Sequence, residues 1–296
     1  MRWGWGIIAV LAACHARLAD PAGGPDAHVT PGADAFDQVV DSADPNVDAA
    51  PLGPWGTPAL IPTGTGPADD GTMSWSGREL VFALNANGTK HLYTMTYGPG
   101  GFGTPALLPF SGTADDESPR FSTDDLTLYF GSTRGGASLD IYAAHRTAVG
   151  GTWSTPAPVV GPNTGGTDKW YAPCDADHYL VVSTTAAGDT DLYEGIVGAA
   201  PAAITALNSA ANETSAFLTR DCLTTYFASA RGATVDLWTS HRTSVNGAWA
   251  APTVVTDFGT AGNEEDPWTS PDSRMFTFAM ATTAAPAQKQ LYLSVR

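Results

Sequence analysis

Acidic side chains recur at matching places along this 296-residue chain, and an alternating apolar segment follows each of them within a few residues. Carboxylates that converge on one axis can bind a cation, act as the acid and base of a hydrolase, or hold neighbouring backbone groups in place. The candidate residues for such a site are Asp70, Asp116, Glu117, Asp168, Glu213 and Glu265. Whether these residues meet depends on the elements that carry them.

Three interpretations of these acids stay open. Because an acid recurs in each sequence unit, it could satisfy backbone N–H groups or pair with the repeated Arg134 and Arg231. The second interpretation is a cation site, since Ca²⁺ takes about six to eight oxygen ligands; Ca²⁺ is the cofactor that the pattern allows, and no other is predicted. The third is glycoside hydrolysis. An acid and a base need different environments, however, and the acids here have similar sequence contexts.

The acids belong to a sequence unit that is repeated several times along the chain. The segment DDESPRFSTDDLTLYFGSTRGGASLDIYAAHR, from Asp115, is similar to NETSAFLTRDCLTTYFASARGATVDLWTSHR, from Asn212. Further copies lie around Thr72, Lys169 and Asp266. Within each copy apolar and polar residues alternate with the period of a β-strand, and turn residues separate the alternating runs. The copies start roughly 45 to 52 residues apart, which is close to the length of a propeller blade.

A fourth segment in each unit indicates how the blades form a ring. Units one, two and four end in FGTPALL, WSTPAPV and WAAPTVV, and unit three ends more weakly in PAAITAL. Unit five runs to Arg296 without this segment, whereas WGTPALI lies before unit one, from Trp55. A propeller avoids an exposed sheet edge when an N-terminal strand pairs into the last blade. We therefore predict an all-β fold, a five-bladed β-propeller of four-stranded antiparallel blades over residues 54–296, with the last blade closed by the N-terminal strand.

The segments DDESPRFSTDDLTLYFGSTRGG, LDIYAAHR and GTWSTPAPV resemble the TolB-like, WD-like β-propeller repeat of bacterial envelope proteins. The Ser-Pro-Asp-Gly turn of that family is similar to residues 270–273, whereas residues 122–125 depart from it. The resemblance implies a propeller that binds partners and performs no chemistry. TolB contacts envelope proteins, but no residue of this chain can be matched to that interface. Five-bladed arabinanase-like hydrolases, which use carboxylates of the innermost strands as acid and base, are the alternative.

The first residues are typical of an export signal. MRWGWGIIAVLAAC combines the basic Arg2 with an apolar run that is too short to span a bilayer. LAAC resembles the lipobox of bacterial lipoproteins, which implies cleavage before Cys14 and its lipidation; an ordinary signal peptide with an accidental cysteine is the alternative. Residues 1–13 are thus a predicted lipoprotein signal peptide, and residues 14–53 are the lipidated cysteine and an acidic disordered tether.

Charge and location limit the partners. The formal net charge of −16 disfavours nucleic acid, because a basic patch would be needed to release phosphate counterions. We expect an exported outer-membrane lipoprotein, periplasmic or at the cell surface, which touches the membrane through its lipid anchor only. Its predicted function is non-enzymatic binding or scaffolding of an envelope protein or polysaccharide at the acidic channel face. A glycoside hydrolase that uses channel carboxylates is the alternative.

Other chemical motifs are weak. The sequence contains no HExxH metal motif, no GxSxG elbow and no phosphate-binding glycine loop. His145 and His241 occupy matching positions of the repeat, which favours a role in the repeat over metal binding. The turn at Gly188 offers Asp189 and Asp191 to a cation, although an ordinary Asp-rich turn explains it as well.

Two cysteines remain once Cys14 is set aside. Cys174 and Cys222 fall in similar hairpins of units three and four, and disulfides persist in exported proteins. Adjacent blades hold equivalent hairpins side by side, so the pair is a candidate disulfide if the Cα atoms approach within about 7 Å. Two separate buried thiols are the alternative.

Overall fold

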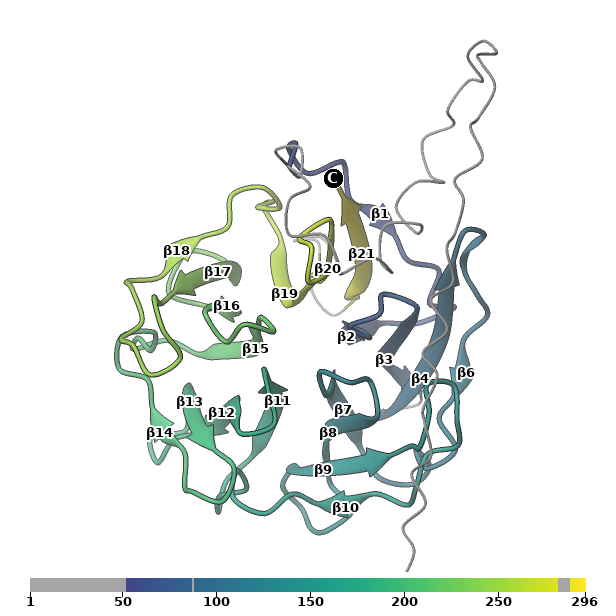
Figure 1. Cartoon of the computed structure of the whole chain (residues 1–296), viewed down its shortest axis with the longest axis horizontal. Helices are drawn as coiled ribbons and strands as arrows, with labels where there is room; N and C mark the ends of the chain where they lie inside the picture. Colours follow the sequence, from purple (N-terminus) through teal and green to yellow (C-terminus); the bar gives the residue numbers. More distant parts are fainter. Residues whose placement is uncertain (1–51, 87, 282–287) are drawn as a thin grey trace, which may run out of the picture.

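The computed structural model describes residues 52–86, 88–281 and 288–296, and the regular elements in these ranges are β-strands. Figure 1 shows the sheets arranged as five blades around a central axis. The predicted all-β, five-bladed propeller is therefore confirmed. The predicted signal peptide, Cys14 and almost all of the predicted tether lie outside the described residues. Within the described ranges, no helix has the length and hydropathy that crossing a bilayer requires.

Every blade is an antiparallel sheet whose first strand lies nearest the axis. Blade one contains β2 (Ala68–Met73), β3 (Glu79–Ala86), β4 (Thr89–Gly98) and β6 (Ala106–Leu107), and the short β5 (Gly101–Phe102) adds a fifth strand to it. Blade two contains β7 (Asp116–Phe121), β8 (Thr127–Ser132), β9 (Asp140–His145) and β10 (Ala157–Pro158). Blade three contains β11 (Asp168–Pro173), β12 (His178–Thr184), β13 (Thr190–Ile196) and β14 (Ala202–Ala203). Blade four contains β15 (Glu213–Leu218), β16 (Thr224–Ser229), β17 (Asp236–His241) and β18 (Thr253–Val254).

Blade five is built from both ends of the described chain. It contains β19 (Asn263–Thr269), β20 (Met275–Ala281) and β21 (Gln290–Val295), and its outer strand is β1 (Ala59–Leu60). The pairing is antiparallel, with Ala59 opposite Leu293 and the backbone N–H of Gly56 donating to the Val295 carbonyl at 2.9 Å. The predicted closure of the ring by the N-terminal strand is confirmed.

An arginine stacked on a tryptophan recurs at the outer part of three blades. The Arg146 guanidinium lies 4.3 Å from the ring centre of Trp153, and Arg242 and Trp249 repeat this distance. In blade five the stack joins the two chain ends, since Arg296 lies 4.0 Å from the ring centre of Trp55. Ring closure therefore forms in blade five a contact that blades two and four form within one loop.

Aromatic side chains fill the space between blades. Phe258, Phe276 and Phe278 form a buried cluster against which Trp55 packs, and the ring centres of Phe258 and Phe276 are 4.6 Å apart. Fully burying one such side chain stabilises the fold by about 1.5–3 kcal/mol. These aromatic residues therefore hold the blades together.

A disulfide between Cys174 and Cys222 joins blades three and four, with the Cα atoms 5.2 Å apart. Cys174 lies in the hairpin between β11 and β12. Cys222 has a φ of 61°, in the turn position that Gly77 occupies in blade one with a φ of 68°. The repeated hairpin geometry thus brings the two candidate cysteines together across a blade interface.

Candidate functional site

A bulge in each innermost strand orients the residues of the channel. The register with the second strand shifts after Asp69, Glu117, Lys169, Thr214 and Glu265. The residue that follows each of these has a positive φ, between 46° and 57°: Asp70, Ser118, Trp170, Ser215 and Asp266. Non-glycine residues adopt this region only where surrounding contacts hold them. The bulge therefore presents one polar side chain per blade at the same level of the channel.

The acid at the start of the innermost strand of blade two makes its contacts locally, with residues in and next to its own blade. Asp116 is fully buried. Its carboxylate accepts hydrogen bonds from the hydroxyls of Ser111 at 2.8 Å and Ser132 at 2.6 Å. The Arg134 guanidinium lies 2.8 Å away. These are the contacts that a structural role of the repeated acid requires.

Glu213 repeats this arrangement in blade four. Its carboxylate accepts hydrogen bonds from the backbone N–H of Ser209 at 2.9 Å and from the Ser229 hydroxyl at 2.7 Å. The Arg231 guanidinium lies 2.9 Å from it. The repeated acid and the repeated arginine therefore form one structural pair per blade in blades two and four.

Blades three and five use hydroxyl groups in place of the arginine. Asp168 accepts hydrogen bonds from the Ser183 hydroxyl and from the Thr164 backbone N–H, the latter at 2.6 Å. Glu264 accepts from the backbone N–H and the hydroxyl of Thr260. Burial is the main cause of the raised pKa of both carboxyl groups. Three of the predicted site residues therefore form local structural contacts and do not join the other acids: Asp116, Asp168 and Glu213.

The other predicted site residues lie at the mouth of the channel, where lysines neutralise them. Lys90, on β4, places its Nζ 3.1 Å from Asp69, 3.0 Å from Asp70 and 2.6 Å from Glu117. One ammonium group therefore links blades one and two.

Two further lysines extend this network. The Nζ of Lys169 lies 2.5 Å from Glu117, and the Nζ of Lys289 lies 2.7 Å from Glu265. We call the whole set the channel-mouth network; it consists of Asp69, Asp70, Lys90, Glu117, Lys169, Glu265, Asp266 and Lys289. Sequence analysis missed all of its lysines. Lys90 and Lys289 share one position of the repeat, two residues before Leu92 and Leu291, but the other three blades have no basic residue at that position.

Side chains cross the axis just inside the mouth. The indole N–H of Trp170 donates to Asp70 at 3.0 Å and to Asp266 at 3.1 Å, which joins blades three, one and five. The Ser215 hydroxyl donates to Asp266 at 2.7 Å. Arg120 is also buried in the channel, and its Nε donates to the Ala216 carbonyl at 3.2 Å. The channel is therefore blocked by hydrogen-bonded side chains.

The network gives its carboxyl groups unequal pKa values. Burial, followed by repulsion from Asp70, raises the pKa of Asp69 to about 8. The same two causes raise the pKa of Asp266 to about 6. Burial opposes the ionisation of Asp70 as well, but attraction by Lys90 and Lys289 outweighs it and holds the pKa of Asp70 below its ordinary value.

The residues of the mouth do not fit a calcium ion. Calcium requires about six to eight oxygen ligands around one point. Here the Lys90 ammonium lies among the oxygens of Asp69, Asp70 and Glu117, where those ligands would have to converge. Within the described part of the chain, the group with ligand atoms close enough for a metal is Cys174, Asp175 and Cys222, and its two sulfurs are bonded to each other.

The remaining candidates have local roles. His145 is exposed, and its Nδ1 lies 3.0 Å from the Thr127 hydroxyl across the blade. Asp189 accepts a hydrogen bond from the Thr185 hydroxyl within its own turn. Burial, followed by repulsion from Asp189, raises the pKa of Asp191. These contacts agree with roles in the repeat and in a turn.

No family model and no curated protein sequence matches this chain. Solved structures do match its fold. The TolB of Agrobacterium tumefaciens superposes with a TM-score of 0.52 at 16% identity, over 73% of this chain and 70% of that one. The TolB of Acinetobacter baumannii matches with a TM-score of 0.50 at 12% identity, over 78% of this chain and 55% of that chain.

An endo-arabinase from Bacteroides thetaiotaomicron matches with a TM-score of 0.55 at 12% identity, over 81% of this chain and 98% of that chain. At such identities a structural likeness establishes the fold alone. The chain is therefore a propeller of TolB-like fold whose structural neighbours include both TolB proteins and an endo-arabinase.

Proposed function

We propose that this protein is a non-enzymatic binding module of the bacterial cell envelope, which holds a protein or polysaccharide partner on its channel face. The observation that carries the proposal is the paired state of the channel-mouth network. Each of its carboxylates contacts a lysine, an indole N–H or a hydroxyl group. Such a network forms a charged surface that is held in place by its own ion pairs and hydrogen bonds. It leaves few carboxylate oxygens free for proton transfer.

Export and anchoring belong to the same proposal. The segment that ends at Cys14 has the layout of a lipoprotein signal, and the acidic residues that follow it suit a tether between membrane and propeller. The TolB-like fold supports an envelope location and an envelope partner. We therefore place the protein on the outer membrane, facing the periplasm or the cell surface.

The mouth favours a partner with both charges or many hydroxyl groups. It contains both lysines and carboxylates, and the lysine side chains remain partly exposed, from 24% to 26% for Lys90, Lys169 and Lys289. A partner loop or a polysaccharide can exchange hydrogen bonds with both kinds of group. Because the protein as a whole is acidic, complementary charge on a protein partner would mainly speed association.

The test compares the retention of a partner by the protein with the release of product from that partner. Tagged protein is incubated with envelope extracts and with a glycan array, and the double variant Lys169→Gln, Lys289→Gln, which alters the mouth while keeping Lys90, is compared in parallel. A binding module retains a partner that the variant loses, and it releases no product from the retained glycan. If the two proteins retain the same partners to the same extent, the channel face is not the binding surface.

Glycoside hydrolysis is a second candidate for a specific reason. Asp69 and Asp70 have pKa values that are pushed apart, as in an acid and a base. The likeness in fold to an endo-arabinase adds to it. Against it, both carboxylates contact the same Lys90 ammonium. Release of reducing sugar from arabinan by the wild type, abolished in Asp69→Asn, would replace the binding proposal with this one.

A further inference from the structure

The disulfide between Cys174 and Cys222 has two ionisable neighbours in the hairpin between β11 and β12. Asp175 places its Oδ2 3.5 Å from the Cys222 Sγ, and the Nδ1 of His178 lies 2.8 Å from the same oxygen. This hairpin follows the end of β11, whereas Lys169 of the channel-mouth network lies near the beginning of that strand. The disulfide and its neighbours are therefore separate from the channel mouth.

One oxygen of the Asp175 carboxylate is used by the hairpin, and the other faces the sulfur. Oδ1 accepts hydrogen bonds from the backbone N–H of Asp177 at 2.7 Å and of His178 at 2.6 Å. Oδ2 faces a sulfur that carries no hydrogen to donate, because it is bonded to the second sulfur. Burial opposes the ionisation of Asp175, but the hydrogen bonds from the hairpin outweigh it and lower the pKa of this carboxyl group. Asp175 therefore presents an ionised oxygen to the disulfide.

The same atoms have the spacing of ligands in a metal site. The Sγ atoms of Cys174 and Cys222 and a carboxylate oxygen of Asp175 all lie within 4.8 Å of one another. Zinc binds thiolate sulfur at about 2.3 Å and carboxylate oxygen at about 2.0–2.2 Å in a tetrahedral arrangement, which places sulfur and oxygen about 3.5 Å apart. The Cys222 sulfur and the Asp175 oxygen have this separation, 3.5 Å. Opening the bond between the sulfurs would therefore leave three suitable ligands around one point.

Both cysteines are held by contacts other than the disulfide. The backbone N–H of Cys174 donates to the His178 carbonyl at 3.1 Å, and that of Cys222 donates to the Thr219 carbonyl at 2.8 Å. The Cys222 carbonyl accepts a hydrogen bond from the Nε of Arg242, also at 2.8 Å. Because these contacts do not involve the sulfurs, the two thiols of the reduced protein should stay near each other.

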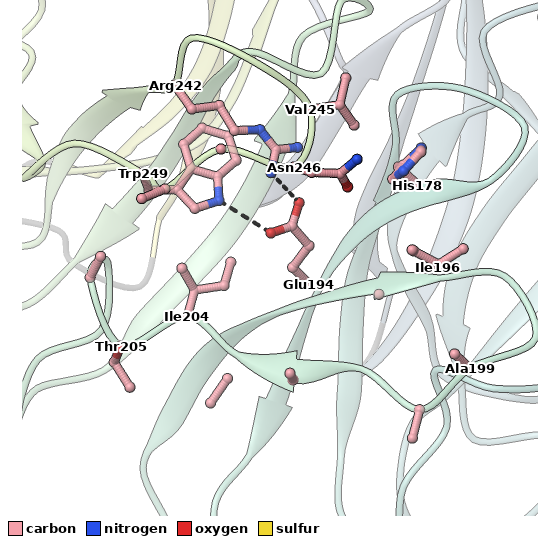
Figure 2. A pocket seen from close by; sticks show the side chains of 17 residues that line it. His178, Glu194, Ile196, Ala199, Ile204, Thr205, Arg242, Val245, Asn246 and Trp249 are labelled. Carbon is pink, nitrogen blue, oxygen red and sulfur yellow. Dashed lines mark hydrogen bonds and ion pairs between the residues drawn. The ribbon is translucent and has the colours of Figure 1, made fainter.

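The two cysteines lie beside a cavity of about 520 Å³ between blades three and four, since His178 also lines that cavity. Figure 2 shows His178 on one side of it and Arg242 on the other, with Glu194 between them. Both cysteines are buried, whereas 42% of the Asp175 side chain is exposed. Asp177, in the same hairpin, is exposed as well. The exposed side of the cluster therefore carries carboxylates, which attract cations.

We propose that Cys174, Cys222 and Asp175 form a zinc-binding site in the reduced protein. The two thiols exist in the newly made chain before its oxidation. A dithiol reductant regenerates them from the disulfide by giving two electrons and two protons to the sulfurs, and it becomes a disulfide itself. Zn²⁺ then displaces the two thiol protons and binds both thiolates and the Asp175 Oδ2, with water as the fourth ligand.

The zinc ion joins blades three and four in place of the disulfide. His178 positions the carboxylate, as hydrogen-bonded partners of metal ligands do. The site uses no residue of the channel-mouth network, so it goes beyond the function proposed for that network.

Cobalt reports this coordination, because Co²⁺ with thiolate ligands in a tetrahedral site absorbs in the near ultraviolet and the visible. The full chain carries Cys14→Ser, so that Cys174 and Cys222 are its remaining thiols, and it is reduced with a phosphine that is then removed. Co²⁺ is titrated into the reduced and the oxidised protein, and Zn²⁺ is added afterwards. Asp175→Asn weakens the oxygen ligand but keeps an acceptor for the hairpin, and Asp177→Asn, at an exposed position of the same hairpin, is the matched control.

The reduced protein should bind Co²⁺ with thiolate absorption that Zn²⁺ removes, and the oxidised protein should show none. Asp175→Asn should weaken binding by about tenfold or more, whereas Asp177→Asn should leave it unchanged. Absence of thiolate absorption in the reduced protein would overturn the proposal. Equal affinity of the two asparagine variants would overturn it too, since an unfolded chain with two free thiols would give that result.

Thermal unfolding is the second measurement. A ligand that binds only the folded state raises the melting temperature. Zn²⁺ should therefore raise the melting temperature of the reduced protein and leave that of the oxidised protein unchanged. The rise should be smaller in Asp175→Asn than in Asp177→Asn. The same melting temperature of the reduced protein with and without Zn²⁺ would count against a folded zinc site.

Discussion

At the channel mouth, carboxylates from three blades are neutralised by lysines and hydrogen bonds, whereas the interface of blades three and four keeps an open space beside its arginine–tryptophan stack. Both regions arise from the same repeat. At the mouth, the recurring bulge directs polar groups to one axis, where they must pair because they are buried together. Between blades three and four, the open space lies at the periphery, where it is lined by residues of these two blades alone.

This contrast explains how a repeat can carry two kinds of surface. Changes at the axis affect several blades at once, since Trp170 alone contacts residues of two other blades. Changes at the outer connections affect one interface. We therefore expect substitutions at the mouth to act on the stability of the whole propeller, and substitutions near the cavity to act locally.

Opening the ring should remove both regions together. Deletion of residues 55–62 removes β1, the stack of Trp55 on Arg296 and the buried Ile61. Losses of this kind amount to about 5 kcal/mol or more, so the melting temperature should fall by about 10 °C or more. Thermal unfolding followed by circular dichroism measures it. Deletion of residues 20–45 is the control, and an equal melting temperature for the two deletions would mean that β1 does not close the ring.

Removing the central lysine of the mouth should be the most costly single substitution there. Lys90→Met leaves Asp70 and Glu117 buried without their shared cation, which costs about 3 kcal/mol of unfolding free energy at neutral pH. The loss should shrink as the pH falls, because protonation removes the uncompensated charges. Denaturant unfolding at several pH values measures both effects. Lys169→Met is the comparison, since Lys169 pairs with Glu117 alone among the acids; an equal loss in the two variants would show that the network does not centre on Lys90.

Reducing the disulfide should increase local opening at the interface of blades three and four, and it should leave the channel mouth unchanged. Cys174 and Cys222 are 48 residues apart in sequence, and closing a loop of this length stabilises a fold by about 2 kcal/mol or more. Hydrogen exchange after reduction, or in Cys174→Ser with Cys222→Ser, should increase in the hairpins of blades three and four. Exchange in blades one and two serves as the internal reference. Uniformly faster exchange in all blades would contradict local behaviour at this interface.

The smallest effect should come from the carboxyl groups of the mouth whose pKa values are raised. The pKa values of Asp69 and Asp266 are about 8 and about 6, so these groups keep protons in the folded state that the unfolded chain releases near pH 4. The unfolding free energy should therefore decline between about pH 4 and pH 8. Below that window, protonation of Asp70, whose pKa is lowered, acts in the opposite direction.

Asp69→Asn tests this pH dependence. The variant should lose much of the decline toward pH 8, because it has no proton to release at this position. Asp124→Asn, at an exposed turn, is the control. An unchanged pH profile in Asp69→Asn would show that the raised pKa does not influence stability.

Much of the fold was predictable because its signals are local. The alternation in LYFGS and TYFAS, the turns between runs and the placement of WGTPALI each depend on a few neighbouring residues, and together they led to five blades and their closure. The extra strand β5 of blade one was not predicted, because the segment around Phe102 reads as part of the outer strand.

The candidate site was predicted only in part. Repetition identified the acids, and the repeated Arg134 and Arg231 identified the partners of Asp116 and Glu213. Repetition was a weak guide to the lysines: Lys90 and Lys289 share a position that is not basic in the other three blades, and Lys169 occupies a position that carries an acid in blades one, two and five. The indole of Trp170 had no signal either, since its place on the axis depends on the bulge and not on its neighbours in sequence.

By itself, the amino-acid sequence determined the number of blades and the position of the closing strand, and it offered the pairing of the repeated acids with Arg134 and Arg231 as one of three interpretations. These features follow from strand periodicity and turn chemistry, which act over a few residues. Only the tertiary structure decided which carboxylates reach the axis, which lysines neutralise them and where a cavity opens between blades. Those outcomes depend on side chains that come from distant segments, and their distances are set when the ring closes and the bulges turn residues such as Asp70 and Asp266 toward a common axis.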